Sequence, residues 1–235
     1  MINLHHLGNP RTLLKAWALM MLALGLWALG LGDALAAEQA ADVVKSGGYG
    51  PAPNLGPADY PQVAGVNSRI TVWIVAHLHL LFAAFVLAVP IFVFIIEAIG
   101  MRTRDKRYDD MAYEFIKVSI TAYSLTAILG GLLAIGLVVF YPQVFQYLSG
   151  VFKETMIWYA VLFFAESAAL YIYYYGWHWL QGGFRKWLHL TLGLVLNGVG
   201  TVLMFLANAW LTFQMSPAGV DAAGVFSGDI WAAIH

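Results

Sequence analysis

The sequence feature that most constrains the fold is a long apolar run from residue 71 to residue 99. The run has two histidines near its start, a proline two-thirds of the way along and one glutamate near its end. About 20 helical residues cross the hydrocarbon core of a bilayer, and a helix satisfies all of its backbone polar groups internally. The run therefore predicts a membrane-spanning helix whose polar positions are used or covered by the rest of the chain.

The composition places the whole chain among integral membrane proteins. Hydrophobic residues make up 61% of the sequence and charged residues only 11%, which a single soluble core does not explain. The formal net charge of -1 argues against a nucleic-acid partner, because nothing would neutralise a run of phosphates. The chain has no cysteine, so its candidate metal or haem ligands are His, Met, Glu and Asp.

The N-terminal residues 1–37 have the form of a secretory signal peptide. Two basic residues, Arg11 and Lys15, precede an apolar stretch at 16–32, and small residues follow at 34–37. An uncleaved anchor helix is the alternative, and in both cases the following residues lie outside the cytoplasm. Residues 38–70 are rich in Gly, Pro and Ala and have no period, which indicates an external periplasmic segment, either laid over the bundle or acting as a flexible linker.

Three further apolar stretches follow the first, at about 113–140, 155–176 and 187–213. Together they predict an all-α membrane protein with a four-helix bundle over residues 71–213. The glycine pair Gly130 and Gly131 lies in the second stretch and permits close approach of a neighbouring helix. Residues 141–154 are expected to form a connector and residues 214–235 an external C-terminal tail.

Positive residues near the ends of the apolar stretches predict the orientation. Nine lie on one side of the bundle and three on the other, and the richer side is expected to be cytoplasmic. The richer set is Arg11, Lys15, Arg102, Arg104, Lys106, Arg107, Lys117, Arg185 and Lys186; the poorer set is Lys45, Arg69 and Lys153. The chain is therefore expected to be a multi-pass protein of a bacterial inner membrane with a periplasmic C-terminus.

The two histidines of the first apolar run cannot serve the same ligand. At about 100° per residue, His77 and His79 point roughly 200° apart around a helix. One is expected to face the bundle and the other a neighbour, water or lipid headgroups. Each can be a haem ligand or an interfacial histidine held by a hydrogen bond.

The remaining polar residues of the apolar stretches are candidates for function or for structure. Glu166 lies near mid-membrane, where it can carry a proton or rest as a neutral acid bonded to a carbonyl. Glu97 can reach the basic residues that follow the first run, which predicts a structural ion pair. His178 and His189 flank the third turn and form either a second site or interfacial side chains. Asn208 can join helices or bond a cofactor.

Several short motifs resemble those of one family. They are HLLF at 79–82, KRYDDMAYEF at 106–115, FFAES at 163–167, YYYGWHWL at 173–180 and LANAW at 206–210 followed by Pro-Ala-Gly. In this order and on these sides of the bundle, they resemble the first four helices of subunit I of the cytochrome bd quinol oxidases. The resemblance covers about residues 69–220.

The resemblance implies specific roles for four residues. His79 takes the position of a haem ligand at the outer side of the membrane, and Glu166 that of a glutamate assigned to proton delivery. His189 and Asn208 also take family positions in the fourth helix, the asparagine near the haem edge. One departure is Trp158, which stands where the family has a second glutamate. The family's quinol loop and its other haem ligands are expected beyond the end of this chain.

These observations predict a cytochrome bd-like subunit of a respiratory complex. It is expected to bind b-type haem through His79 and to transfer electrons between an outer-side partner and other haems, quinone or oxygen. The expected partners are other membrane subunits and a periplasmic cytochrome or oxidoreductase subunit, and His77 can serve a partner's cofactor. The alternative is a haemless structural or assembly subunit of a membrane oxidoreductase. A proton or ion channel is a third hypothesis, and it rests on Glu166 alone.

Overall fold

The computed structural model describes residues 51–234 apart from 55, 57–59 and 64. The chain divides into two units, Met1–Gly48 and Tyr49–His235, and the fold described here is that of the second. The predicted signal peptide or anchor at 1–37 lies outside the described residues, as does the external segment up to residue 50.

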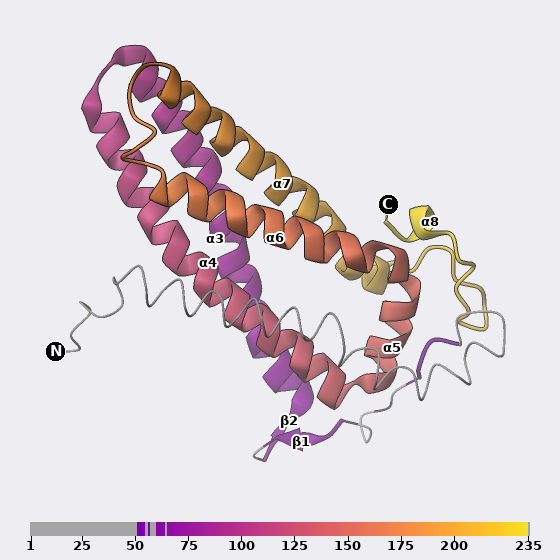
Figure 1. Ribbon diagram of the computed structural model, residues 1–235. Helices are drawn as coiled ribbons and strands as arrows, with labels where there is room; N and C mark the ends of the chain where they lie inside the picture. Colours follow the sequence, from indigo (N-terminus) through magenta and orange to yellow (C-terminus); the bar gives the residue numbers. More distant parts are fainter. Residues whose placement is uncertain (1–50, 55, 57–59, 64, 235) are drawn as a thin grey trace. The chain divides into compact units, whose positions relative to one another are not determined.

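Four long helices make up most of the described chain (Figure 1). They are α3 Ser68–Thr103, α4 Lys106–Phe140, α6 Lys153–Tyr175 and α7 Gly183–Met215. Each is long and apolar enough to cross a membrane. The 36 residues of α3 span about 54 Å at 1.5 Å per residue, more than the ~30 Å of a hydrocarbon core. The predicted all-α membrane bundle of four spans is confirmed.

Capping residues explain why α3 and α4 begin earlier than the apolar stretches predict. The side chain of Asn67 accepts a hydrogen bond from the amide of Arg69, and that of Asp105 accepts one from the amide of Arg107. Between the two helices Arg104 adopts a φ of 58°, which reverses the chain. Hydrogen bonds from the Arg107 guanidinium hold the pKa of the Asp105 carboxyl below its usual value.

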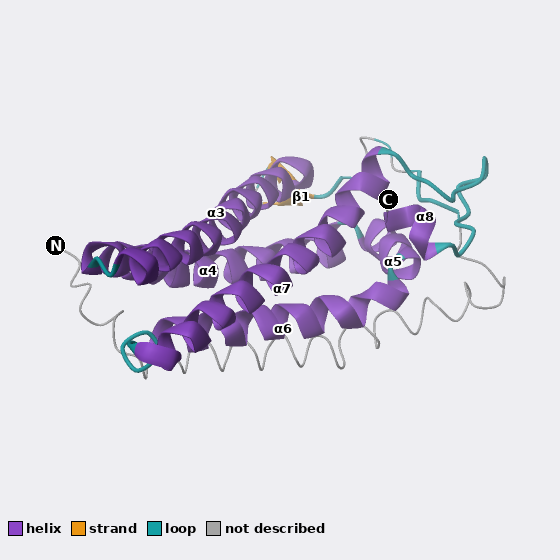
Figure 2. Cartoon of the chain, turned by 90° about the horizontal axis from the view of Figure 1, so that it is seen from above, coloured by secondary structure: helices purple, strands orange, loops and turns teal. Residues whose placement is uncertain are grey.

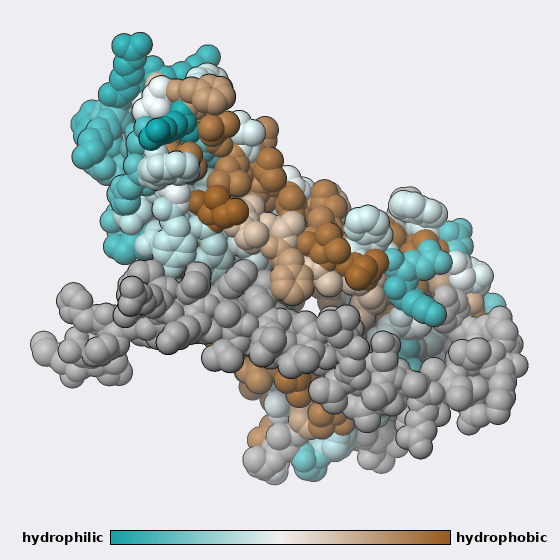
Figure 3. All heavy atoms as spheres, viewed as in Figure 1, coloured by the Kyte–Doolittle hydropathy of each residue, from teal (hydrophilic) through white to brown (hydrophobic). Residues whose placement is uncertain are grey.

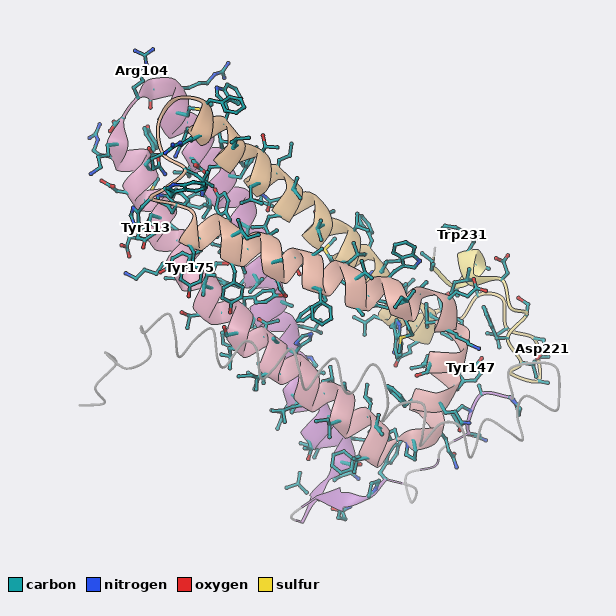
Figure 4. All side chains as sticks on the ribbon, in the orientation of Figure 1. Arg104, Tyr113, Tyr147, Tyr175, Asp221 and Trp231 are labelled. Atoms are coloured by element: carbon teal, nitrogen blue, oxygen red, sulfur yellow. The ribbon has the colours of Figure 1, made fainter. Side chains whose placement is uncertain are left out.

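Short elements form a cap at one end of the four long helices (Figure 2). The predicted connector at 141–154 is largely helical, as α5 Pro142–Val151, and begins with a proline at a position where its missing N–H costs nothing. The tail forms α8 Ile230–Ile234. The strands β1 Gln62–Val63 and β2 Val66–Asn67 pair as an antiparallel hairpin. We call the end with α5 and α8 the cap end; Figure 4 shows Tyr147 and Asp221 there.

The opposite end is the basic end, formed by the α3–α4 turn and the loop 176–182 between α6 and α7. Arg104 lies at its tip (Figure 4), and hydrophilic side chains gather there on the face shown in Figure 3. Hydrophobic side chains follow α6 and α7 away from it (Figure 3). This distribution matches a protein whose middle lies in a bilayer and whose ends meet water.

The four helices share a core only in the half toward the basic end. That core ends, toward the cap, at a layer of one buried residue from each helix: Val86, Tyr123, Glu166 and Gly200. Between this layer and the cap, no residue of 69–85, 124–140, 156–165 or 201–208 is buried. The α3–α4 and α6–α7 hairpins diverge in this direction (Figure 1). We call this stretch the open half, and the layer its floor.

Candidate functional site

His79 lies in the open half, on α3, and faces α4. Its Nδ1 is 3.0 Å from the carbonyl oxygen of Thr126 on α4. Because a carbonyl only accepts hydrogen bonds, Nδ1 carries the hydrogen and Nε2 keeps its lone pair. A histidine held in this way is oriented to bind a metal or a haem iron through Nε2.

Gly130 gives the His79 ring its space against α4. A Cβ atom added at Gly130 would lie 2.9 Å from Cε1 of His79, closer than real Cβ contacts come. A Cβ atom at Gly131 would meet nothing within 4 Å. Of the predicted glycine pair, Gly130 is therefore the residue that permits the close approach. The group that approaches it is the imidazole of His79 on α3.

His77 has different surroundings from His79, as their spacing predicts. It is exposed, and its Nδ1 lies 2.8 Å from the carbonyl oxygen of Trp73 in the same helix. The centroids of the His77 and Trp73 rings are 4.6 Å apart. Of the two histidines, His79 is the one that α4 holds in place.

Glu166 occupies the floor of the open half with its carboxyl unpartnered. Its exposed fraction is 7%, and its carboxyl forms no hydrogen bond or ion pair with any described residue. A Cβ atom added at Gly200 would lie 2.5 Å from its Oε1, so the glycine makes room for the carboxyl. An unpaired charge inside a membrane is costly, and Glu166 is therefore expected to hold a proton at rest.

The tight contact between Gly200 and Glu166 gives a first prediction. Gly200→Ala should lower the midpoint of thermal unfolding, because overpacking a filled site costs about 1–3 kcal/mol. Gly198→Ala is the matched control, since a Cβ there meets nothing within 4 Å and alanine favours the helix. Unfolding of the purified protein in detergent measures both variants, and equal midpoints would contradict the assigned position of the carboxyl.

A hydrogen-bonded pair of hydroxyl groups links α4 to α6 at the residue that follows Glu166 in the sequence. The hydroxyls of Tyr123 and Ser167 are hydrogen-bonded to each other, and Ser167 donates to the carbonyl of Phe163 at 2.7 Å. Tyr123 and Ser167 are both buried. This bond connects α4 to α6 at the level of the floor.

A buried ionic cluster joins all four helices near the basic end. Glu97 of α3 is fully buried, and its Oε1 lies 2.7 Å from Nζ of Lys186 and 2.6 Å from Nδ1 of His189. The hydroxyl of Tyr173 donates to the other carboxylate oxygen. Lys186 also lies 2.9 Å from Oδ1 of Asp109 on α4. We call these five residues the Glu97 cluster.

The Glu97 cluster changes the interpretation of the histidines near the basic end. Both ring nitrogens of His189 have partners, since Nε2 lies 2.9 Å from the carbonyl oxygen of Tyr173. His189 therefore has no free nitrogen for an iron, despite its expected cofactor role. His178 is exposed and its ring lies 4.8 Å from that of Tyr113. The described structure does not bring His178 and His189 together as a second site.

Glu97 forms the predicted structural ion pair, but with a different partner from the one expected. Its cation is Lys186 at the start of α7, and not a residue of the basic stretch 102–107. Sequence reasoning also missed Tyr173, which lies in a run of three tyrosines typical of an interface. A lysine so close to an apolar stretch was the one available signal for this cluster.

Two further residues that the family motifs single out are exposed. Asn208 is exposed on α7, where its amide donates to the Thr212 hydroxyl at 3.2 Å. Trp158 is 58% exposed on α6, so the position of the family's second glutamate does not face the shared core. Among the described residues there is no group of three His, Asp or Glu placed to hold a metal ion. His79 is the candidate ligand that the fold orients for an iron.

Comparison with protein families decides the relationship of the chain. The family model of cytochrome bd terminal oxidase subunit I matches residues 67–235. The chain belongs to this family. Membership confirms the resemblance read from the short motifs and makes the chain a respiratory oxidase-like membrane subunit. No curated protein and no solved structure gives a significant match.

The match to cytochrome bd subunit I begins one residue before α3 and includes all four spans. Proteins of this family bind haem, and the geometry of His79 fits that requirement. Its Nδ1 is held by a backbone carbonyl, and its Nε2 has no hydrogen bond to a described residue. In the open half around it, none of the described side chains of α3 and α4 is buried. Apolar surface of this kind suits a flat, largely apolar group.

Proposed function

We propose that this cytochrome bd family member binds b-type haem through Nε2 of His79. In this function it transfers electrons between an outer-side partner, at the cap end, and other haems, quinone or oxygen. The observation that carries the proposal is the hydrogen bond from Nδ1 of His79 to the carbonyl of Thr126, which presents Nε2 as a ligand. That the group is haem b rests on family membership together with the absence of cysteine.

When bound, the haem supplies one-electron oxidation and reduction. His79 holds the iron, and its bond to Thr126 fixes the ring orientation and raises the basicity of Nε2. Gly130 keeps the ring close to α4. The apolar side chains of the open half exclude water from the electron-transfer site.

Glu166 is the proposed proton-carrying residue of the site. It is the buried α6 residue of the layer that forms the floor of the open half. Its neutral carboxyl can give its proton to a nearby site and be reprotonated afterwards, so that a positive charge follows each electron into a low-dielectric medium. The space around the carboxyl is kept by Gly200.

The proposed orientation places the basic end in the cytoplasm and the cap end, with the C-terminus, in the periplasm of a bacterial inner membrane. The excess of positive residues at the basic end supports it. His79 then lies toward the periplasmic side, within reach of a periplasmic cytochrome or oxidoreductase subunit. The exposed His77 is available to a cofactor held by another membrane subunit.

The haem content of the purified complex tests the proposal. A pyridine haemochrome assay on the complex isolated through this chain should show haem b at one or more per chain. If other subunits also contain haem, dissociation of the complex in detergent should leave part of it with this chain. The alternative, a haemless structural subunit, predicts that none remains, and that result would contradict the proposal.

The fit of the ring against Gly130 gives a second prediction. Gly130→Ala should displace the imidazole of His79 and lower the haem content of this chain, because the new methyl group would lie 2.9 Å from Cε1. Gly131→Ala is the matched control, with open space around its Cβ and unchanged haem expected. Absorption spectra of both purified variants measure the difference, and equal haem contents would count against His79 as the ligand.

A further inference from the structure

We infer that the turn between α6 and α7 binds the phosphate of an anionic phospholipid, with Arg185 as the residue that holds it. The lipid belongs to the membrane leaflet at the basic end. The inference goes beyond the proposed function, because it involves neither haem nor the side of the membrane on which this end lies. It rests on the membrane spans and on the side chains of the turn.

Large aromatic side chains are exposed at this turn and at the start of α7. The exposed fraction is 70% for Trp179, 75% for Phe184 and 60% for Trp187. Exposing such rings to water is unfavourable, whereas tryptophan is enriched at the boundary between hydrocarbon and lipid headgroups. The turn therefore lies at that boundary.

The surface of α7 that continues from the turn is that of a lipid-facing helix. Exposed apolar side chains recur on it at spacings of four and seven residues, which place them on one face. They are Phe184, Leu188, Val195 and Val202. Acyl chains pack against such a face, so the headgroup of a lipid that lies there reaches the turn.

The same part of the chain forms two cation–π pairs, one in the core and the other at the surface. Nζ of Lys186 lies 5.2 Å from the ring centroid of Trp177, and both residues are buried. The guanidinium carbon of Arg185 lies 5.6 Å from the ring centroid of Trp179, and both residues are exposed. Trp179 thereby orients a guanidinium at the outer surface of the turn.

Among the described residues, only the buried cation of these two pairs has anionic partners. Nζ of Lys186 lies 2.7 Å from Oε1 of Glu97 and 2.9 Å from Oδ1 of Asp109. Arg185 forms no ion pair or hydrogen bond with a described residue. A guanidinium has five N–H donors in a planar arrangement that fits two oxygens of a phosphate. A lipid phosphate would complete the surface pair as the two carboxylates complete the buried one.

The α3–α4 turn adds positive charge at the same end. Arg102 and Arg104 are exposed and form no ion pair with a described residue, whereas Arg107 lies 2.6 Å from Asp105. Basic side chains next to a membrane attract anionic lipids. A soluble phosphate would meet these charges but would leave the exposed rings in water. Charge and apolar surface together therefore select a phospholipid.

Photolabelling of the intact complex tests the inference. The complex is placed in phosphatidylcholine nanodiscs with a trace of phosphatidylglycerol that has a photoactivatable group at the top of one acyl chain. Mass spectrometry then quantifies the label on the peptide that contains the α6–α7 turn. Arg185→Gln should lower this labelling about five-fold, which corresponds to ~1 kcal/mol of binding free energy.

Arg107→Gln is the matched control. It removes the same charge at the same end, but from an arginine that is already paired with Asp105. Labelling of the turn should stay within about two-fold of the wild-type level, because an exposed pair contributes little. Equal labelling in Arg185→Gln and Arg107→Gln would reduce the effect to general charge and would overturn the inference.

Competition identifies the ligand. Unlabelled phosphatidylglycerol should displace the label from the turn, and glycerol phosphate in the aqueous phase should not, because it has no acyl chains. Displacement by glycerol phosphate would assign the turn to a soluble phosphate and would also overturn the inference.

Haem content measured on the same samples separates this inference from the proposed function. It should be unchanged in Arg185→Gln, since Arg185 lies outside the open half. A complex whose chain has no haem but is labelled selectively at the turn would keep the lipid site and reject the proposed function. A complex whose chain has haem b and is labelled equally in both variants would do the reverse.

Discussion

Replacing His79 by alanine is expected to abolish haem binding by this chain, reducing its haem absorption to background. An iron held by an imidazole loses that ligand outright, and the described residues contain no group of three His, Asp or Glu that could hold it instead. The Thr126 carbonyl would lose one hydrogen bond, which costs only about 0.5–1.5 kcal/mol. The variant should therefore remain folded, and pyridine haemochrome assays on the purified complex should report the loss directly.

His77→Ala is the matched control for this substitution. The two histidines lie two positions apart on α3, and both have Nδ1 bonded to a carbonyl, but only His79 is bonded to α4. The control should keep the haem of this chain. Loss of haem in His77→Ala with retention in His79→Ala would move the ligand to the exposed histidine and would reject the account of Gly130 as well.

Replacing Lys186 by methionine is expected to destabilise the protein by about 3–5 kcal/mol, the usual cost of breaking a buried ion pair. The substitution leaves the fully buried Glu97 carboxylate without its lysine partner, 2.7 Å away in the wild type. It also removes the bond to Asp109, and with it a connection between α7 and α4. Denaturation of the purified protein in detergent measures the change in unfolding free energy.

Lys117→Met provides the comparison for Lys186→Met. Lys117 pairs with Glu114 at 3.3 Å on the surface of α4, with both side chains more than half exposed. Such a pair contributes about 0–1 kcal/mol. A double variant, Glu97→Gln with Lys186→Met, should recover part of the loss because the fully buried carboxylate is removed together with its lysine partner. Equal destabilisation in the two lysine variants would show that the Glu97 cluster is not the main connection among the helices.

The number and type of helices were predictable from the sequence because spanning a bilayer imposes a length and an apolar composition. The positions of the helix ends were less predictable. A hydropathy pattern does not detect capping residues such as Asn67 and Asp105. These residues start α3 and α4 before the apolar stretches begin. It also does not detect the helix α5, which lies between two of the apolar stretches.

The candidate site was predictable in part. Helical spacing separated His77 from His79, but it did not say which one faces the bundle; family motifs made that choice, and Gly130 was a local signal consistent with it. The partner of Glu97 could not be predicted, because Lys186 meets it only when α7 folds back on α3. Local sequence patterns report neighbours within a helix, whereas such contacts depend on how helices pack.

The most direct test of the central claim is a cryo-electron microscopy map of the complex isolated with this chain. The account predicts porphyrin density in the open half, with iron bound to Nε2 of His79 and Nδ1 still bonded to the carbonyl of Thr126. A map showing side chains or lipid against His79 in place of a porphyrin, or iron bound to His77 alone, would contradict it.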